Sequence, residues 1–118
     1  MHSSFKHSAK AMLAILPLAS LALLTPVRAE TPAQFEVTLK GDVFSPAEIK
    51  VPAGKPFTLK FMNQDAAAAE IEAKDLKIEK IVAGNSDIIA RVGAMKPGRY
   101  LFVNEYKEDT VKGYVVVE

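Results

Sequence analysis

Apolar and polar residues alternate strictly between residues 35 and 40, with Phe35, Val37 and Leu39 on one side of an extended chain. A period of two is typical of a strand with one buried face. The same pattern, or a run of β-branched residues, predicts further strands at 47–51, 57–61, 87–92, 99–103 and 113–117. Turn-forming groups such as Gly41-Asp42 separate these segments. About seven short strands at this spacing predict an all-β fold, a β-sandwich.

The segment 66–80 fits two structures. Asp65 precedes four alanines and could cap a helix, and Glu70 and Lys74 have the i,i+4 spacing that supports one. Alternation at Ile71/Ala73 and at Leu76/Ile78 favours two extended pieces instead. The pattern alone leaves both structures open.

The N-terminal segment has the organisation of a secretory signal peptide. Lys6 and Lys10 precede an apolar run at 12–24, and Val27 and Ala29 form a small-residue cleavage site. The run is short for a membrane span, although a retained anchor is the alternative interpretation. We therefore expect a cleaved signal peptide at 1–29, a short polar leader at 30–34 and one exported domain at 35–118.

Charge and composition limit the chemistry of the exported chain. After residue 29 it has 12 basic and 14 acidic residues, a net charge of −2, with no basic stripe of the kind that binds nucleic acid. The sequence has no cysteine, and its two histidines, His2 and His7, lie in the predicted signal peptide. Catalytic triads, Cys-His pairs and zinc sites are thereby excluded. Any metal ligands must be oxygens, with a methionine thioether as the soft alternative.

Several acidic residues are candidate metal ligands. Glu70 and Glu72 would point to the same side of a strand, and carboxylate oxygens suit hard cations and accept iron. The alternative is an ordinary solvated strand face with lysine partners. A later polar loop at 104–112 adds further acids, and a methionine precedes a Pro-Gly turn. The full set of candidates is Glu70, Glu72, Glu79, Glu105, Asp109 and Met95.

Three blocks of sequence carry a family resemblance. The first block, at 43–63, opens with Val-Phe-Ser-Pro-Ala-Glu-Ile-Lys-Val-Pro-Ala-Gly and ends with a strand that closes on Asn63. The second is Glu-Ile-Glu-Ala-Lys-Asp-Leu-Lys-Ile-Glu-Lys-Ile at 70–81, and the third is the segment 95–117 with Met-Lys-Pro-Gly-Arg-Tyr and Gly-Tyr-Val-Val-Val. The chain resembles the EfeO-type cupredoxin-like domain family, especially its stand-alone periplasmic members from bacterial ferrous-iron transport operons. The resemblance implies a cupredoxin-like Greek-key β-sandwich of about seven to eight strands. It also implies that the segment 66–80 is extended.

The resemblance further implies a function. It suggests that the protein binds an iron or copper ion, principally through Glu72 and Glu79, and passes iron toward an inner-membrane permease. A periplasmic iron-binding protein would be a second partner, and a homodimer is one option. Carboxylates brought together in this way would repel one another, so at least one pKa should be raised.

The chain also departs from copper-binding cupredoxins. Asn104 stands about where they have a cysteine, Ala69 or Glu70 where they have the first histidine, and Val111 near the usual methionine. A blue-copper site needs two histidines and a cysteine, so blue-copper electron transfer is not expected. Three functional classes remain: a metal-handling subunit of an iron uptake system, a copper-dependent ferrous oxidase, and a metal-free docking module.

Overall fold

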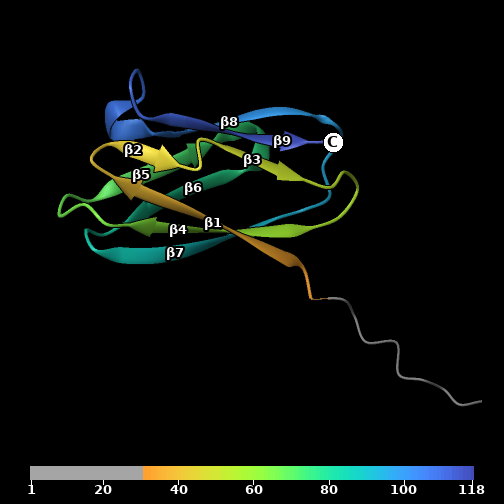
Figure 1. Ribbon diagram of the computed structural model, residues 1–118, viewed down its shortest axis with the longest axis horizontal. Coiled ribbons are helices and arrows are strands. Elements are labelled where there is room, and N and C mark those ends of the chain that lie inside the picture. Colours follow the sequence, from red (N-terminus) through yellow and green to blue (C-terminus); the bar gives the residue numbers. More distant parts are fainter. Residues whose placement is uncertain (1–30) are drawn as a thin grey trace, which may run out of the picture.

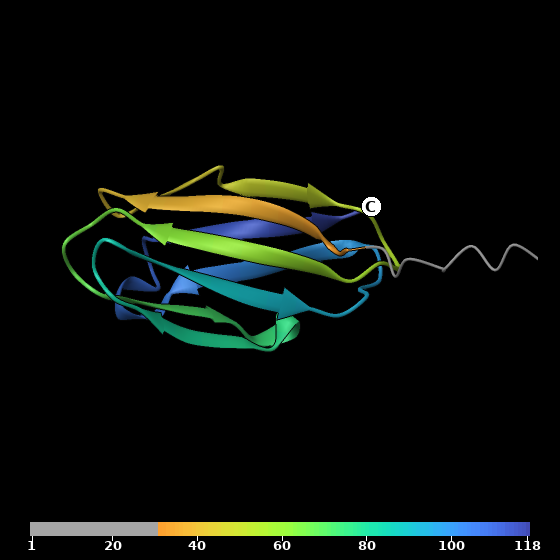
Figure 2. The ribbon, with the colours of Figure 1, turned by 90° about the horizontal axis from the view of Figure 1, so that it is seen from below.

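The computed structural model describes residues 31–118, and the predicted signal peptide lies outside the described residues. Two β-sheets are stacked face to face (Figures 1 and 2). The first has the strand order β2-β1-β4-β7, with β1 at Ala33–Lys40, β2 at Val43–Ser45, β4 at Phe57–Asn63 and β7 at Ser86–Val92. The second has the order β3-β9-β8-β5-β6, with β3 at Glu48–Val51, β5 at Ala69–Ala73, β6 at Ile78–Val82, β8 at Gly98–Asn104 and β9 at Lys112–Val117.

The pairing between strands is mixed. β1 pairs with β4 and β3 with β9 in parallel, while the other neighbours are antiparallel. The predicted all-β sandwich is confirmed, with nine strands in residues 31–118 instead of the expected seven to eight. The unpredicted strand is β2, which has only three residues and no alternation long enough to recognise. It forms a hairpin with β1 because Gly41 and Asp42 both have positive φ angles, 58° and 59°, as tight hairpin turns require.

The middle of the chain is extended, as the resemblance implied. β5 and β6 flank a single 3-10 turn, η1 (Lys74–Leu76), and Lys77 then reverses the chain with φ of 56°. Ala69, Ile71 and Ala73 point into the core at alternate positions of β5. Burial of this face in the sandwich overrides the helical propensity of the alanine-rich segment.

The core between the sheets is centred on three aromatic rings. Phe102 lies edge-to-face against Phe44 and Phe61, with ring centroids 5.0 and 5.5 Å apart. Gly113 faces the same ring, and a Cβ there would lie 2.3 Å from the ring of Phe102. No side chain fits at this position, so a glycine is needed there for the ring of Phe102 to lie against β9. The core fixes the strands whose ends carry the candidate site.

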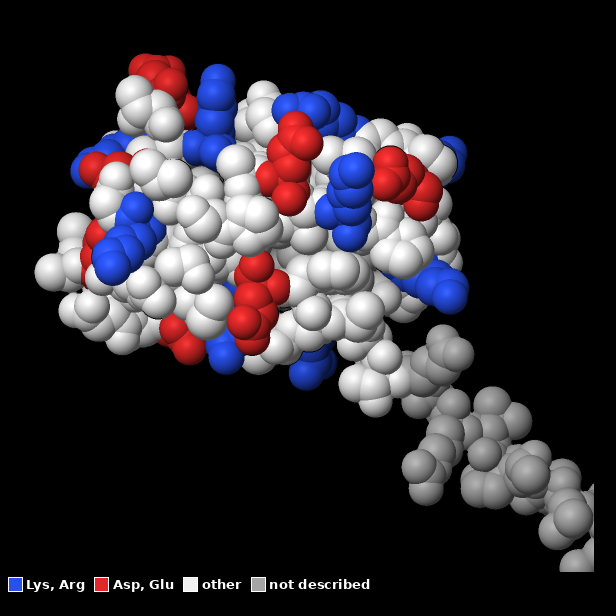
Figure 3. Space-filling view, in the orientation of Figure 1, with Lys and Arg blue, Asp and Glu red and all other residues white. Residues whose placement is uncertain are grey.

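Two further features concern the surface. Lys/Arg and Asp/Glu side chains are interspersed over the face shown in Figure 3, with no continuous region of one sign. Within residues 31–118 there is no helix of the length and apolar character needed to cross a membrane.

Candidate metal centre

The interior position at which the resemblance would place copper ligands is occupied by Ala69, Asn104 and Val111. Ala69 and Val111 are each 1% exposed, and Asn104 is 4% exposed. The backbone N–H of Asn104 donates to the carbonyl of Val111 at 2.9 Å. Its side-chain Oδ1 accepts hydrogen bonds from the N–H groups of Glu70 (3.1 Å) and Tyr106 (3.3 Å). Both lone pairs of this oxygen are used, so the interior does not fit a copper ion.

We therefore expect no intense blue colour when the protein is titrated with Cu(II), because that colour needs a copper–thiolate bond. The measurement is the visible absorption spectrum of untagged protein in thiol-free buffer. Any bound Cu(II) should give only the weak spectrum of oxygen ligands. A strong visible band would contradict this assignment of the interior.

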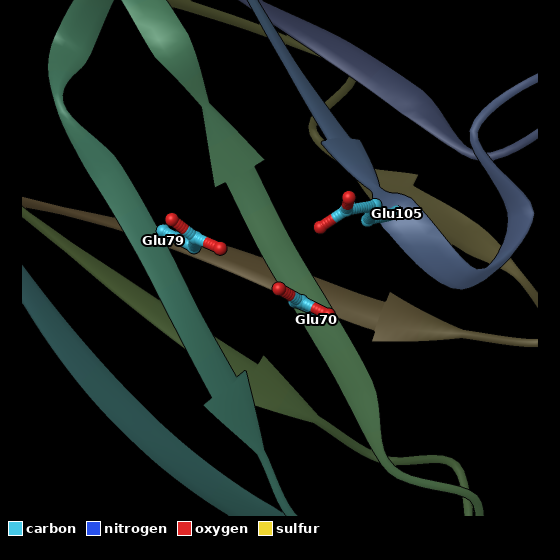
Figure 4. Close-up of side chains that lie close together, drawn as sticks. All are labelled: Glu70, Glu79 and Glu105. Carbon is cyan, nitrogen blue, oxygen red and sulfur yellow. The ribbon is translucent and has the colours of Figure 1, made fainter.

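The acidic side chains gather on the outer surface of the second sheet. Glu70 and Glu72 alternate with buried residues of β5 and so face outward, and Glu79 of β6 is the cross-strand partner of Glu72. Glu105 begins η2 (Glu105–Lys107), the 3-10 turn that follows β8. One carboxylate oxygen from each of Glu70, Glu79 and Glu105 lies within 4.8 Å of the other two. Figure 4 shows these three side chains over β5, with Glu79 and Glu105 approaching from either side. We call Glu70, Glu79 and Glu105 the carboxylate cluster.

The cluster changes the acidity of one of its members. Hydrogen bonds first to Glu70 and then to Glu72 raise the pKa of Glu105 to about 7, with smaller contributions from burial and from the two negative charges. The protonated form can donate to a neighbouring carboxylate, whereas the ionised form is repelled by it. The direction is the one expected for carboxylates brought together, with hydrogen bonding as the main cause.

This pKa gives a testable pH dependence. Because the pKa of Glu105 rises from 4.5 to about 7 on folding, the folded chain binds more protons between these pH values than the unfolded chain. The metal-free protein should therefore lose stability as pH rises from about 4.5 to about 7. Urea unfolding at several pH values, in the presence of a chelator, measures this. Glu105→Gln should flatten that part of the profile, whereas an equal slope in the variant would contradict the assignment.

The other predicted ligands lie at varying distances from the cluster. Glu72 is the neighbour of Glu79, but it also forms an ion pair with Lys74 at 3.5 Å. Asp109 lies in the loop after η2 and lines a groove of about 360 Å³ together with Glu72. Met95 lies before β8 and packs against the hydrophobic core, whereas Glu105 follows the other end of β8. The structure therefore places Met95 against the core, the packing role that is the alternative to metal binding, and does not bring it to the carboxylates.

Loops from the first sheet support η2, a feature that the sequence analysis missed. The carboxylate of Asp65 accepts hydrogen bonds from the N–H groups of Gly41 (2.7 Å) and Asp42 (3.2 Å), and these hydrogen bonds lower the pKa of Asp65. Asp42 in turn accepts a hydrogen bond from Lys107 Nζ at 2.6 Å. The β1–β2 turn and the loop after β4 thus hold η2, the turn that carries Glu105, in place through Lys107. The sequence did show a Gly-Asp turn at 41–42, which predicts the positive φ angle of Asp42, but it did not show that this turn contacts Lys107.

The donor set decides which ions the cluster suits. Three carboxylates are hard, anionic donors, which suit Mn²⁺, Fe²⁺ or Fe³⁺ and do not suit Cu⁺. A cation bound at the cluster would compete with the proton that Glu105 shares with Glu70 and Glu72. Glu79 is exposed, so the cluster is open to solvent.

Comparisons with known proteins agree with the architecture. A family model described as a cupredoxin-like domain matches residues 11–117. An uncharacterized protein of Rickettsia prowazekii (strain Madrid E) is 31% identical over 84 residues, which are 71% of this chain and 67% of that protein.

Solved structures extend the comparison. The metal-binding domain of the Cu(I)-exporting P-type ATPase CopA of Streptococcus pneumoniae D39 is similar with a TM-score of 0.62 and 20% identity, over 72% of this chain and 84% of that one. Auracyanin A, a "blue" copper protein from Chloroflexus aurantiacus, is similar with a TM-score of 0.61 and 19% identity, over 75% of this chain and 100% of that one. At these identities the similarity shows the fold alone.

Proposed function

The chain belongs to the cupredoxin-like domain family, and from this premise we propose that it is a periplasmic metal-binding protein that handles iron through its carboxylate cluster. Proteins of similar fold bind copper, as their names state. In this chain the interior position is filled by Ala69, Asn104 and Val111, so the same fold would serve a different site.

The observation that carries this proposal is the convergence of three carboxylates from three separate elements. Glu70, Glu79 and Glu105 come from β5, β6 and η2, and like charges held this close are unfavourable without a cation or a shared proton. Glu79 is exposed and Glu70 is half-buried, so the cluster can exchange a metal with solvent or with a partner. Such access suits a protein that passes iron on more than one that stores it.

The resemblance to the EfeO-type family supports a place in ferrous-iron uptake. In this proposal the protein is exported after cleavage of residues 1–29, receives iron directly or from a periplasmic iron-binding protein, and delivers it to an inner-membrane permease. The cluster would hold the ion as cargo, and Glu72, which hydrogen-bonds Glu105, would help to orient that ligand.

A second candidate function is a copper-dependent ferrous oxidase. The copper-binding proteins of similar fold favour it, and the lack of histidine and cysteine after residue 29 argues against it. The two functions differ in what happens to ferrous iron, since an oxidase consumes it whereas a carrier only binds it.

Anaerobic titration with Fe(II) tests the proposal. We expect one Fe(II) per chain by calorimetry at neutral pH, with an affinity at least about tenfold lower in Glu79→Gln because one charged ligand is lost. Glu36→Gln, an exposed carboxylate in β1 of the other sheet, is the matched control and should bind as the wild type does.

The same samples, exposed to air with and without Cu(II), separate the two functions. A carrier should leave the rate of Fe(II) oxidation unchanged or slow it, whereas copper-dependent acceleration would favour the oxidase. Absence of Fe(II) binding at millimolar concentration would overturn the iron-handling proposal.

A further inference from the structure

A groove beside the carboxylate cluster is open on the outer face of the second sheet. Its volume is about 360 Å³. Its floor is apolar, because Leu101 and Val103 of β8 point outward, on the same side as Glu72, the register partner of Val103. Leu101 is 42% exposed, whereas Val103 is only 9% exposed. The groove is lined by Glu72, Lys74, Asp75, Leu101, Val103, Glu108 and Asp109.

The rim of the groove is mostly acidic. Lys74, the one lysine among its lining residues, forms an ion pair with Glu72 at 3.5 Å. Within residues 31–118, the remaining acids Asp75, Glu108 and Asp109 have no lysine or arginine nitrogen within 4.0 Å. Lys112 is the partner of Val103 across β9, but it is not part of the lining. Three carboxylates without a cationic partner within 4.0 Å therefore surround a floor of which Leu101 is the exposed part.

This combination fits one kind of side chain particularly well. Lysine and arginine bury an aliphatic stem on an apolar surface and hold a charged head at its edge. Stems lying on Leu101 and Val103 would place their heads beside Asp75 on one wall and Glu108 and Asp109 on the other. Within the chain, Lys74 pairs its ammonium with Glu72 at 3.5 Å while 87% of its side chain stays exposed, so it leaves the floor of the groove uncovered.

We propose that the groove over Leu101 and Val103 is a docking site for an extended segment of a partner protein in which lysines or arginines alternate with apolar residues. The charge of the groove selects the basic side chains, and its floor accepts the residues between them. This inference goes beyond the proposed function and holds whether or not the cluster binds iron. If both hold, Glu72 would lie between the docked segment and the cluster.

The test uses a peptide of stated sequence, Ac-Lys-Leu-Lys-Leu-Lys-NH₂, and ¹⁵N-labelled purified protein in the presence of a chelator at about 0.15 M salt, where weak surface attraction is screened. We expect amide shift changes confined to residues 72–75, 101–103 and 108–109. The variant Asp75→Lys/Glu108→Lys should bind the peptide at least about tenfold more weakly, because two attractive contacts become repulsive. The peptide Ac-Glu-Leu-Glu-Leu-Glu-NH₂ should not bind.

The control variant Glu36→Lys/Asp87→Lys has the same change of net charge on the other sheet and should bind as the wild type does. Shift changes spread over the whole surface, equal weakening in both variants, or no binding would each overturn the proposal. Asp75 and Glu108 are not members of the carboxylate cluster, so this experiment and the Fe(II) titration can fail separately.

Discussion

Replacing Asn104 by Leu is expected to lower the free energy of unfolding by about 2–4 kcal/mol, because it leaves two backbone N–H groups without an acceptor. These are the N–H groups of Glu70 and Tyr106, which both donate to Asn104 Oδ1 in a part-buried environment. For a domain of this size the melting temperature should fall by roughly 10–20 °C. Chemical unfolding of the wild type and the variant measures the loss.

The same substitution should weaken metal binding as well. Asn104 joins β5, which carries Glu70, to η2, which carries Glu105, so its side chain helps to set the distance between two members of the cluster. Asn63→Leu is the matched control, since Asn63 is equally buried and its amide group holds the loops at Ala67 and Ala83. We expect both variants to lose stability but only Asn104→Leu to lose affinity for metal. A stable Asn104→Leu protein would show that these hydrogen bonds contribute little.

The fold was largely predictable because its strands obey a simple rule. The alternation at Phe35, Val37 and Leu39 appears in the structure as β1, with Val37 and Leu39 buried. The structure places the start of β1 at Ala33, within the segment expected to be a polar leader, because pairing with β4 continues through Ala33 and Gln34. Strand pairing depends on backbone hydrogen bonds, which a hydrophobic pattern does not record.

The segment 66–80 shows where local pattern is insufficient. Its alanines and its Glu70–Lys74 spacing favour a helix, yet β5 lies between β8 and β6 in the sheet. Ala69 and Ala73 are each 1% exposed in β5, and only the rest of the sandwich supplies the burial that overrides their helical propensity. The family resemblance gave the right prediction here because it carries information about tertiary structure.

The candidate site was predictable in part. Glu70, Glu79 and Glu105 were all singled out in the sequence, and the structure brings them together. Glu72, expected to be a principal ligand, is instead divided between Lys74 and Glu105. Whether two carboxylates in adjacent strands converge depends on register and side-chain direction, and these follow from the turn at 74–77.

The role of Asn104 could not be read from the sequence in the same way. Its position was recognised only as the place where a cysteine was missing. The structure shows that its amide oxygen accepts two backbone hydrogen bonds, a role that an amide oxygen performs well and that a copper-bound thiolate would perform less fully. The position at which the resemblance would place a cysteine thus helps to stabilise this end of the sandwich.

The central claim is that the carboxylate cluster binds a hard cation, and thermal unfolding with and without metal tests it most directly. With free Mn(II) or anaerobic Fe(II) at a hundredfold excess over its dissociation constant, the wild type should gain about 2.7 kcal/mol of stability. The variant Glu70→Gln/Glu79→Gln/Glu105→Gln keeps the side-chain shapes and removes the charges, and its melting temperature should not respond to metal. Glu36→Gln should respond as the wild type does. A wild-type melting temperature unchanged at millimolar metal, or a shift that survives in the triple variant, would contradict the claim.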